Sequence, residues 1–289
     1  MDLYQYDFMI RALIGALVIG LVAPTLGIYL VQRRLSLIGD GIGHVALTGV
    51  GVGLLLHRSP VVTAVVVSVL ASVGIELLRQ RGRTSGDLAL TVLFYGGIAG
   101  GVVLVGLSDS TNANLAQYLF GSLTTTSRQD LVVIGGLGAV VFTAMIALRP
   151  ALFAISSDEE YARVSGLPVR TLNLILAATT AMTVTIAMRT VGLLLISALM
   201  VVPVVAAQQI ARGFQRTLLL SVLIGVAAAA AGVTLSGEIN TAPGATIVIL
   251  TIGVFLLLAA VGALARLRRP AQIRDAVAAE PPEVKIVVP

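Results

Sequence analysis

Long apolar runs take up most of this chain and leave only short polar links between them. A helix needs about 20 predominantly apolar residues to cross the hydrocarbon core of a bilayer, and most of the runs approach that length. A spanning helix also satisfies its own backbone hydrogen bonds in lipid. We therefore predict an all-α, polytopic transmembrane helical bundle of about nine spans, which are Ala12–Val31, Leu37–Leu56, Val61–Ile75, Leu88–Leu107, Leu131–Leu148, Thr171–Met188, Thr190–Ala211, Thr217–Ser236 and Ala245–Ala265.

The composition supports one membrane domain. Hydrophobic residues make up 57% of the 289 residues and charged residues 11%, whereas soluble domains carry about 25% charged residues. We expect residues 1–265 to form the transmembrane domain and residues 266–289 a flexible cytoplasmic tail. The first run should be a retained helix, because the acidic N-terminus lacks the positive charge of a signal peptide. The third run should extend to Leu78, with Glu76 and Arg79 paired at i,i+3.

The positions of the basic residues predict the orientation. If the first helix runs inward, fifteen Arg and Lys residues fall on the cytoplasmic side, and the outer side keeps four, which are Arg11, Arg58, Arg128 and Arg189. Cytoplasmic loops carry such an excess of positive charge, so we predict that the N-terminus is outside and the C-terminus inside. The net charge of +5 follows from this asymmetry. It does not indicate nucleic acid as a partner, because the basic residues are scattered singly.

Several kinds of catalytic site are excluded by the residues present. There is no cysteine, so disulfides, thiolate metal sites and cysteine nucleophiles are absent. Lys285 is the only lysine and lies in the tail, which excludes a phosphate-binding loop ending in Lys-Ser/Thr. The two histidines are His44 and His57, and they do not form a His-Glu-x-x-His motif. We expect no enzyme and no permanently bound cofactor, and any ATP hydrolysis would occur in a separate chain.

Asp40 and His44 lie four residues apart inside the second predicted span. Ionisable groups in a membrane cost about 2.5–3.5 kcal/mol each on insertion scales, so such residues indicate a functional site. At i and i+4 the two side chains share one helix face, and carboxylate and imidazole are ligand types common to Zn²⁺, Mn²⁺ and Fe²⁺. We predict a weak metal site on a transport path. The alternative is a pair that only satisfies itself within the bundle, and His57 is read as an ordinary loop histidine.

Glycines crowd two of the predicted spans. Small residues let helix backbones approach in lipid, so the first interpretation is helix packing. In the second span, glycines around Asp40 and His44 have an alternative role, which is to clear space for a passing ion. The glycines concerned are Gly39, Gly41, Gly43, Gly49, Gly51 and Gly53 in the second span and Gly96, Gly97, Gly100 and Gly101 in the fourth.

One predicted cytoplasmic loop is rich in polar residues. The stretch from Ser156 to Pro168 begins with Ser and Asp, continues with Glu-Glu and ends with Gly-x-Pro. This order of residues is typical of a short capped helix. Such a helix is a candidate docking surface for a soluble partner, and the alternative is a simple connecting turn.

Three stretches resemble the membrane permease subunit of the zinc/manganese/iron type of bacterial ATP-binding-cassette metal importers. The most specific is Arg33 to His44, which is similar to the family's Arg-Arg…Gly-Asp-x-x-x-His entry to the second helix. Residues 118–123 resemble its Phe-Gly-Ser/Asp-Leu segment. Asp158 to Gly166 resembles the Asp-x-Glu-x-Ala-x-x-x-Gly coupling helix. Together the pattern covers nearly the whole chain.

The resemblance implies a multi-pass protein of the bacterial cell membrane that imports a divalent transition metal, zinc or manganese and possibly iron. Asp40 and His44 would contact the metal, and Asp158, Glu159, Glu160, Ala162 and Gly166 would couple the permease to its ATPase. The implied partners are a cytoplasmic ATP-binding subunit, an extracytoplasmic metal-binding protein, a second copy of the chain and membrane lipid.

Some features leave alternatives open. The family usually has an acidic residue where we align Asn240, so a role of that outer loop in metal handling rests on nearby Glu238. Permeases for vitamin B12 and siderophores share the Gly-Ser-Leu and coupling-helix features but lack the Gly-Asp-x-x-x-His run. An importer of such an organic metal complex is one alternative, and a non-transporting membrane scaffold is another. The sequence does not specify which metal is carried, nor whether residues 112–126 re-enter the membrane.

Overall fold

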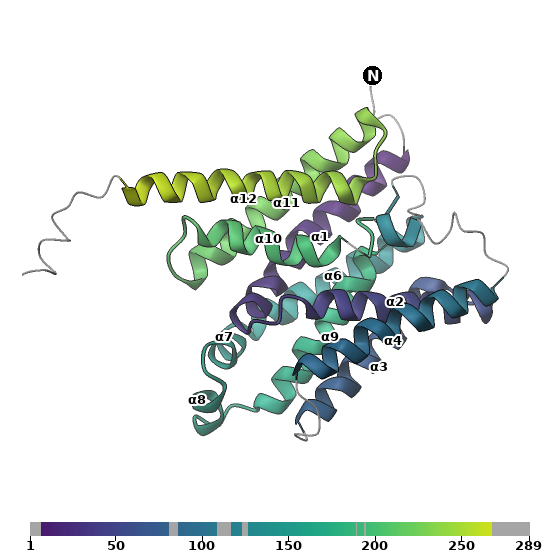
Figure 1. The fold of residues 1–289 in the computed structure, drawn as a ribbon, viewed down its shortest axis with the longest axis horizontal. Coiled ribbons are helices and arrows are strands. Elements are labelled where there is room, and N and C mark those ends of the chain that lie inside the picture. Colours follow the sequence, from purple (N-terminus) through teal and green to yellow (C-terminus); the bar gives the residue numbers. More distant parts are fainter. Residues whose placement is uncertain are drawn as a thin grey trace, which may run out of the picture.

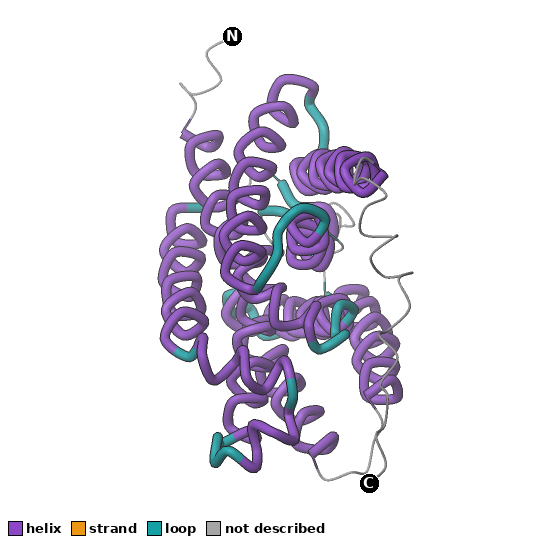
Figure 2. Tube along the Cα trace, turned by 90° about the vertical axis from the view of Figure 1, so that its left-hand side faces the viewer, coloured by secondary structure: helices purple, strands orange, loops and turns teal. Residues whose placement is uncertain are grey.

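The computed structural model describes residues 7–80, 86–108, 117–122, 127–188, 190–193 and 195–267. Within these ranges the regular structure is helical, and Figure 2 shows no strand in them. The helices are α1 (Asp7–Gln32), α2 (Ile38–Leu55), α3 (Pro60–Gln80), α4 (Gly86–Leu107), α6 (Arg128–Ala147), α7 (Arg149–Ser157), α8 (Glu159–Val164), α9 (Val169–Ala187), α10 (Ile196–Gln208), α11 (Phe214–Ile239) and α12 (Pro243–Leu267). From residue 268 onward the predicted tail, residues 266–289, lies outside the described residues, as do residues 112–116 and 123–126 of the segment 112–126.

Eight of the predicted spans are confirmed as helices long and apolar enough to cross a membrane. The third span extends past Leu78 to Gln80, as expected. Its predicted ion pair is present, because Arg79 Nε lies 2.8 Å from Glu76 Oε2. The all-helical fold class therefore follows from the length and spacing of the apolar runs.

The seventh predicted span is only partly helical. We expected Thr190–Ala211 to be continuous, but α10 begins at Ile196 and has 13 residues. At a rise of 1.5 Å per residue such a helix is about 20 Å long, which is short of the roughly 30 Å hydrocarbon core. The described residues between α9 and α10, which are 188, 190–193 and 195, are not helical, although they are as apolar as the rest of the run.

Residues 117–122, which lie far upstream in the sequence, pack against this break. Val191 and Leu193 are fully buried, and the Leu193 amide donates to the Tyr118 carbonyl at 3.0 Å. Gly121 and Gly192 have φ of 75° and 94°, which glycine adopts without strain. A Cβ on Gly192 would clash with the Phe120 backbone. Irregular backbone within a membrane domain is tolerated where protein buries it and pairs its polar groups, and both conditions hold here.

The core forms around α1, which packs against α6, α10 and α11, while α2 packs against α3 and α4 (Figure 1). The helix α9 contacts both groups and joins them. Where α1 meets α11, a Cβ on Gly20 would lie 2.8 Å from the Gly225 carbonyl oxygen, so the two backbones are close. The α1 side chains that fill this core, Ile19, Leu26 and Tyr29, are completely buried.

Arginines predicted to face the cytoplasm gather at shared ends of the helices. Arg79, Arg163 and Arg170 line one cavity, and a second cavity is lined by Arg149, Arg212 and Arg216. In Figure 1 the helices α7 and α8 lie at the lower left, the end where α10 turns into α11. The grouping agrees with the predicted topology. That this end is cytoplasmic stays a prediction from the distribution of positive charge.

Candidate functional site

The helix α2 carries both predicted metal ligands near its N-terminal end. Asp40 lies in the first turn and is half-buried, while His44 is 8% exposed. The ring of Phe94 on α4 meets the His44 ring edge to face, with centroids 4.5 Å apart. The helix thus buries the imidazole against α4 and leaves the carboxylate one turn nearer the helix end.

The imidazole of His44 is not satisfied by its neighbours. Its Nδ1 atom is buried and has no hydrogen-bond partner. Buried polar atoms nearly always have a partner, so each exception needs an explanation. This unpaired nitrogen argues against the alternative in which Asp40 and His44 only satisfy each other's hydrogen-bonding groups. An imidazole nitrogen without a partner is able to accept a ligand.

The glycines of α2 serve helix packing. A Cβ on Gly49 would lie 2.5 Å from Ala64 Cα on α3, and one on Gly39 would lie 2.8 Å from Ser197 Oγ on α10. Around the predicted ligands, Leu90 would meet a Cβ on Gly41 at 3.0 Å, and Leu193 one on Gly43 at 3.4 Å. The space that these glycines could have left for an ion is therefore occupied by neighbouring side chains.

The glycines of α4 divide into two classes. A Cβ on Gly97 would lie 2.5 Å from the His44 carbonyl carbon and from the Val45 nitrogen, so α2 and α4 touch backbone to backbone at His44. Thr48 donates to the Gly97 carbonyl at 2.8 Å across the same contact. Gly96, in contrast, has nothing within 4 Å of its Cβ position. Gly97 therefore fixes the distance between α4 and the predicted ligands.

A single copy of the chain offers two donors here. Among the described residues, no group of three or more His, Cys, Asp or Glu side chains could hold a metal ion. A four-coordinate ion would take its other ligands from water or from the same pair in a second copy. Two donors make a weak site, which suits a path that the ion must leave again.

The polar loop forms two short helices. Ser156 and Ser157 end α7, and Asp158 caps α8, where its side chain accepts from the Tyr161 amide at 2.9 Å. At the other end Gly166 has φ of 82°, and its amide donates to the Arg163 carbonyl. This is a Schellman motif. The capped helix is confirmed, and its start lies at Asp158.

Replacing Gly166 by valine should loosen the end of α8. A Cβ at Gly166 meets nothing within 4 Å, so the cost comes from the left-handed backbone and should be about 1–2 kcal/mol. Hydrogen exchange at the amides of residues 166 and 167 should be faster than in the wild type. Ser165→Ala is the control, because Ser165 has φ of −73° and alanine adopts that conformation freely. Equal exchange in both variants would contradict the prediction.

The five predicted coupling residues face different ways. Ala162 is completely buried and Glu159 is half-buried, while Asp158, Glu160 and Gly166 are exposed. Two large apolar residues of this stretch point outward, since Tyr161 is 70% and Val164 is 89% exposed. The inner side of α8 therefore packs on the bundle, and its outer side presents apolar surface.

Sequence reasoning missed the partners of Glu159. Arg33, directly after α1, donates from Nη2 to Glu159 Oε2 and from Nη1 to Asn173 Oδ1, both at 2.6 Å. Burial lowers the pKa of Arg33, and the charge of Glu159 opposes that shift. The other carboxylate oxygen of Glu159 accepts from Arg163 at 3.1 Å. The two partners of Arg33 are 126 and 140 residues away along the chain, so they leave no local pattern in the sequence.

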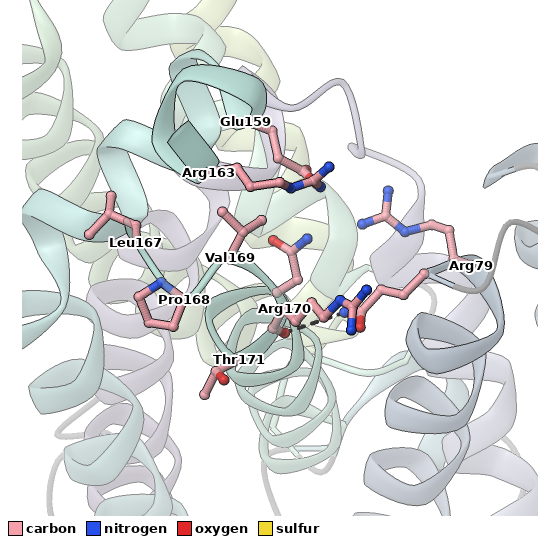
Figure 3. Close-up of a pocket in the computed structure, with 10 residues that line it drawn as sticks. Arg79, Glu159, Arg163, Leu167, Pro168, Val169, Arg170 and Thr171 are labelled. Carbon is pink, nitrogen blue, oxygen red and sulfur yellow. Dashed lines mark hydrogen bonds and ion pairs between the residues drawn. The ribbon is translucent and has the colours of Figure 1, made fainter. Parts of the chain in front are cut away.

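Beside this cluster lies a cavity of about 670 Å³. Figure 3 shows Glu159 and Arg163 next to each other, with Arg79 reaching toward them from α3. Arg79 also holds Glu76 through two hydrogen bonds of 2.8 and 3.0 Å. The cavity thus collects side chains from α3, α8 and α9 at one end of the bundle.

Asn240 has a structural role. It adopts left-handed backbone with φ of 54° and ψ of 50° and ends α11 as its C-cap. Asparagine is among the residues that tolerate this conformation best. The side chain of nearby Glu238 is exposed.

Comparisons with known proteins agree with this arrangement. Residues 5–262 match the ABC 3 transport family. The chain is 32% identical over 256 residues to the manganese import system permease protein ScaB of Streptococcus parasanguinis, which covers 89% of this chain and 91% of ScaB. It is 29% identical over 253 residues to the high-affinity zinc uptake system membrane protein ZnuB of Haemophilus influenzae, covering 88% and 97% of the two chains.

The fold has a close counterpart among solved structures. PsaBC from Streptococcus pneumoniae in complex with Fab matches with a TM-score of 0.77 and 29% identity, over 89% of this chain and 92% of that chain. The residues that match the family include α2, with its half-buried carboxylate and buried imidazole, and the capped helix α8. Because the family match extends over most of its length and its helices are long and apolar, the chain belongs to the ABC 3 transport family and is a multi-pass bacterial membrane protein.

Proposed function

We propose that this chain is the permease subunit of an ATP-driven importer of a divalent transition metal, with Asp40 and His44 on the translocation path. The observation that carries the proposal is the buried His44 Nδ1 without a partner, one turn from a half-buried carboxylate. Relatives named for manganese import and zinc uptake support a transition-metal cargo. Carboxylate and imidazole bind zinc, manganese and ferrous iron alike, so the delivered ion is selected by the binding protein.

The proposed complex contains two copies of this chain, two copies of a cytoplasmic ATPase and an extracytoplasmic metal-binding protein. The ATPase docks on α8, since Tyr161 and Val164 expose large apolar side chains on a helix that is capped at both ends. Exposed apolar groups on a water-facing helix are typical of a protein contact. ATP binding and hydrolysis then move α8 and alternate the access of the path between the two sides of the membrane.

Uptake by proteoliposomes tests this function. The permease is reconstituted with its ATPase and loaded binding protein, and radioactive Zn²⁺ and Mn²⁺ are counted inside the vesicles. We expect ATP-dependent uptake of at least one ion and none when ATP is replaced by ADP. Uptake of only a siderophore or corrinoid complex would favour the organic-complex alternative. No ATP-dependent uptake of any cargo would favour a scaffold role.

A further inference from the structure

A short turn with several backbone hydrogen bonds joins α1 to α2. The Arg34 amide donates to Val31, the Leu35 amide to Leu30 and the Ile38 amide to Leu35, at 2.9–3.1 Å. Arg34 takes left-handed backbone with φ of 58° within this turn. The turn leads directly into α2, whose first turn contains Asp40. A displacement at the start of this turn is therefore passed to the helix that carries the predicted metal ligands.

Arg33 ties this turn to the cytoplasmic helices. Its side chain is 8% exposed and divides its guanidinium between Glu159 at the start of α8 and Asn173 on α9. The helix α8 otherwise packs against α7 and α9, so this ion pair is a polar link from α8 to the α1–α2 turn. A charged hydrogen bond of this length is stronger than a neutral one.

The ion pair between Arg33 and Glu159 allows α8 and the α1–α2 turn to move together. If α8 shifts, Glu159 either draws Arg33 with it or leaves a buried guanidinium without its counter-charge, and the second outcome is costly. Asn173 offers a neutral acceptor that keeps Arg33 oriented toward α9. On the exposed side, Arg163 holds the second oxygen of Glu159, so the carboxylate is fixed by both arginines.

We propose that Arg33 is the positioning residue that transmits the movement of α8 to α2, and so makes the state of Asp40 and His44 depend on the ATPase. This inference rests on the proposed function, because it assumes that α8 receives the ATPase. The substrate does not touch Arg33. Its role is to join the ATP-driven movement to the metal path, and its loss separates the two.

The test is a double-mutant cycle on the reconstituted transporter, with Arg33→Gln, Glu159→Gln and both together. The measured quantity is the number of metal ions imported per ATP hydrolysed. We expect each single variant to hydrolyse ATP while this ratio falls about fivefold or more, the range typical of coupling between two sites. The double variant should be no worse than either single one, because residues that act through each other are not additive. Arg33→Lys should recover part of the ratio, because it restores the charge.

Arg34→Gln is the matched control, since it removes the neighbouring charge from the same turn and should keep the wild-type ratio. Multiplicative losses in the double variant, or an unchanged ratio in Arg33→Gln, would overturn the inference. If the variants lose transport and ATP hydrolysis in equal proportion, Arg33 is only structural and the inference fails as well. These outcomes are separate from failure of the proposed function, in which the wild-type protein itself imports no metal.

Discussion

Replacing His44 by asparagine is expected to abolish most metal uptake by the reconstituted transporter while the protein stays folded. Loss of even an outer-shell partner weakens metal binding about 10–100-fold, and an imidazole that contacts the ion contributes at least as much. Asp40→Asn should act in the same direction, because it removes the negative charge that attracts the cation. Initial rates of Zn²⁺ and Mn²⁺ uptake at several concentrations measure the effect.

The chain supplies its own control for this experiment. His57, the second of its two histidines, is exposed just past the end of α2 with φ of 48°, a conformation that asparagine tolerates. His57→Asn should therefore fold normally and transport like the wild type. Wild-type uptake in His44→Asn and Asp40→Asn, with both proteins present at normal levels in the membrane, would remove the metal path from this part of α2.

Gly97→Leu should strongly destabilise the permease. Any Cβ at this position would lie 2.5 Å from the His44 carbonyl carbon, so α2 and α4 must separate to accept it. Overpacking a tight contact costs about 1–3 kcal/mol, and this contact is backbone, which does not rotate away. We expect a cost at the upper end of that range and a fall in the melting temperature of roughly 6 °C or more, measured in detergent by size exclusion after heating.

Gly96→Leu separates this steric effect from the general effect of the substitution. Gly96 is the preceding residue of the same helix, and its Cβ position has nothing within 4 Å. It should melt near the wild-type temperature, because leucine is a better helix former than glycine. Similar melting temperatures for the two variants would mean that α2 and α4 are not in close contact at His44.

Much of the fold could be predicted because the hydropathy of the sequence shows directly how long each apolar run is. Eight spans and the extension of α3 were predicted from apolar runs and one i,i+3 pair. The break before α10 could not be predicted, because its residues are as apolar as those of the neighbouring membrane-spanning helices. The break depends on a backbone contact between Gly121 and Gly192. These two glycines lie far apart in the sequence, and no sequence pattern marks them as partners.

Some features of the candidate site could be predicted from the sequence and others could not. Asp40 and His44 stood out because ionisable groups in an apolar helix are expensive, and the caps of α8 follow local rules at Asp158 and Gly166. The pairing of Glu159 with Arg33 was not predictable, because a carboxylate at the start of a short helix gives no sign of which distant arginine it will meet. The roles of the glycines also needed the structure. Sequence shows that they are small, and only the packing shows which helix each one meets.

The unwound stretch before α10 has a consequence for how the protein is made. The amide of Leu193 is paired with the carbonyl of Tyr118, and an unpaired peptide group in lipid costs several kcal/mol. Because the chain emerges from the ribosome N-terminus first, Tyr118 is synthesised before Leu193. The acceptor of this hydrogen bond is therefore made before its donor, so the bond can form as soon as the residues near Leu193 reach the membrane domain.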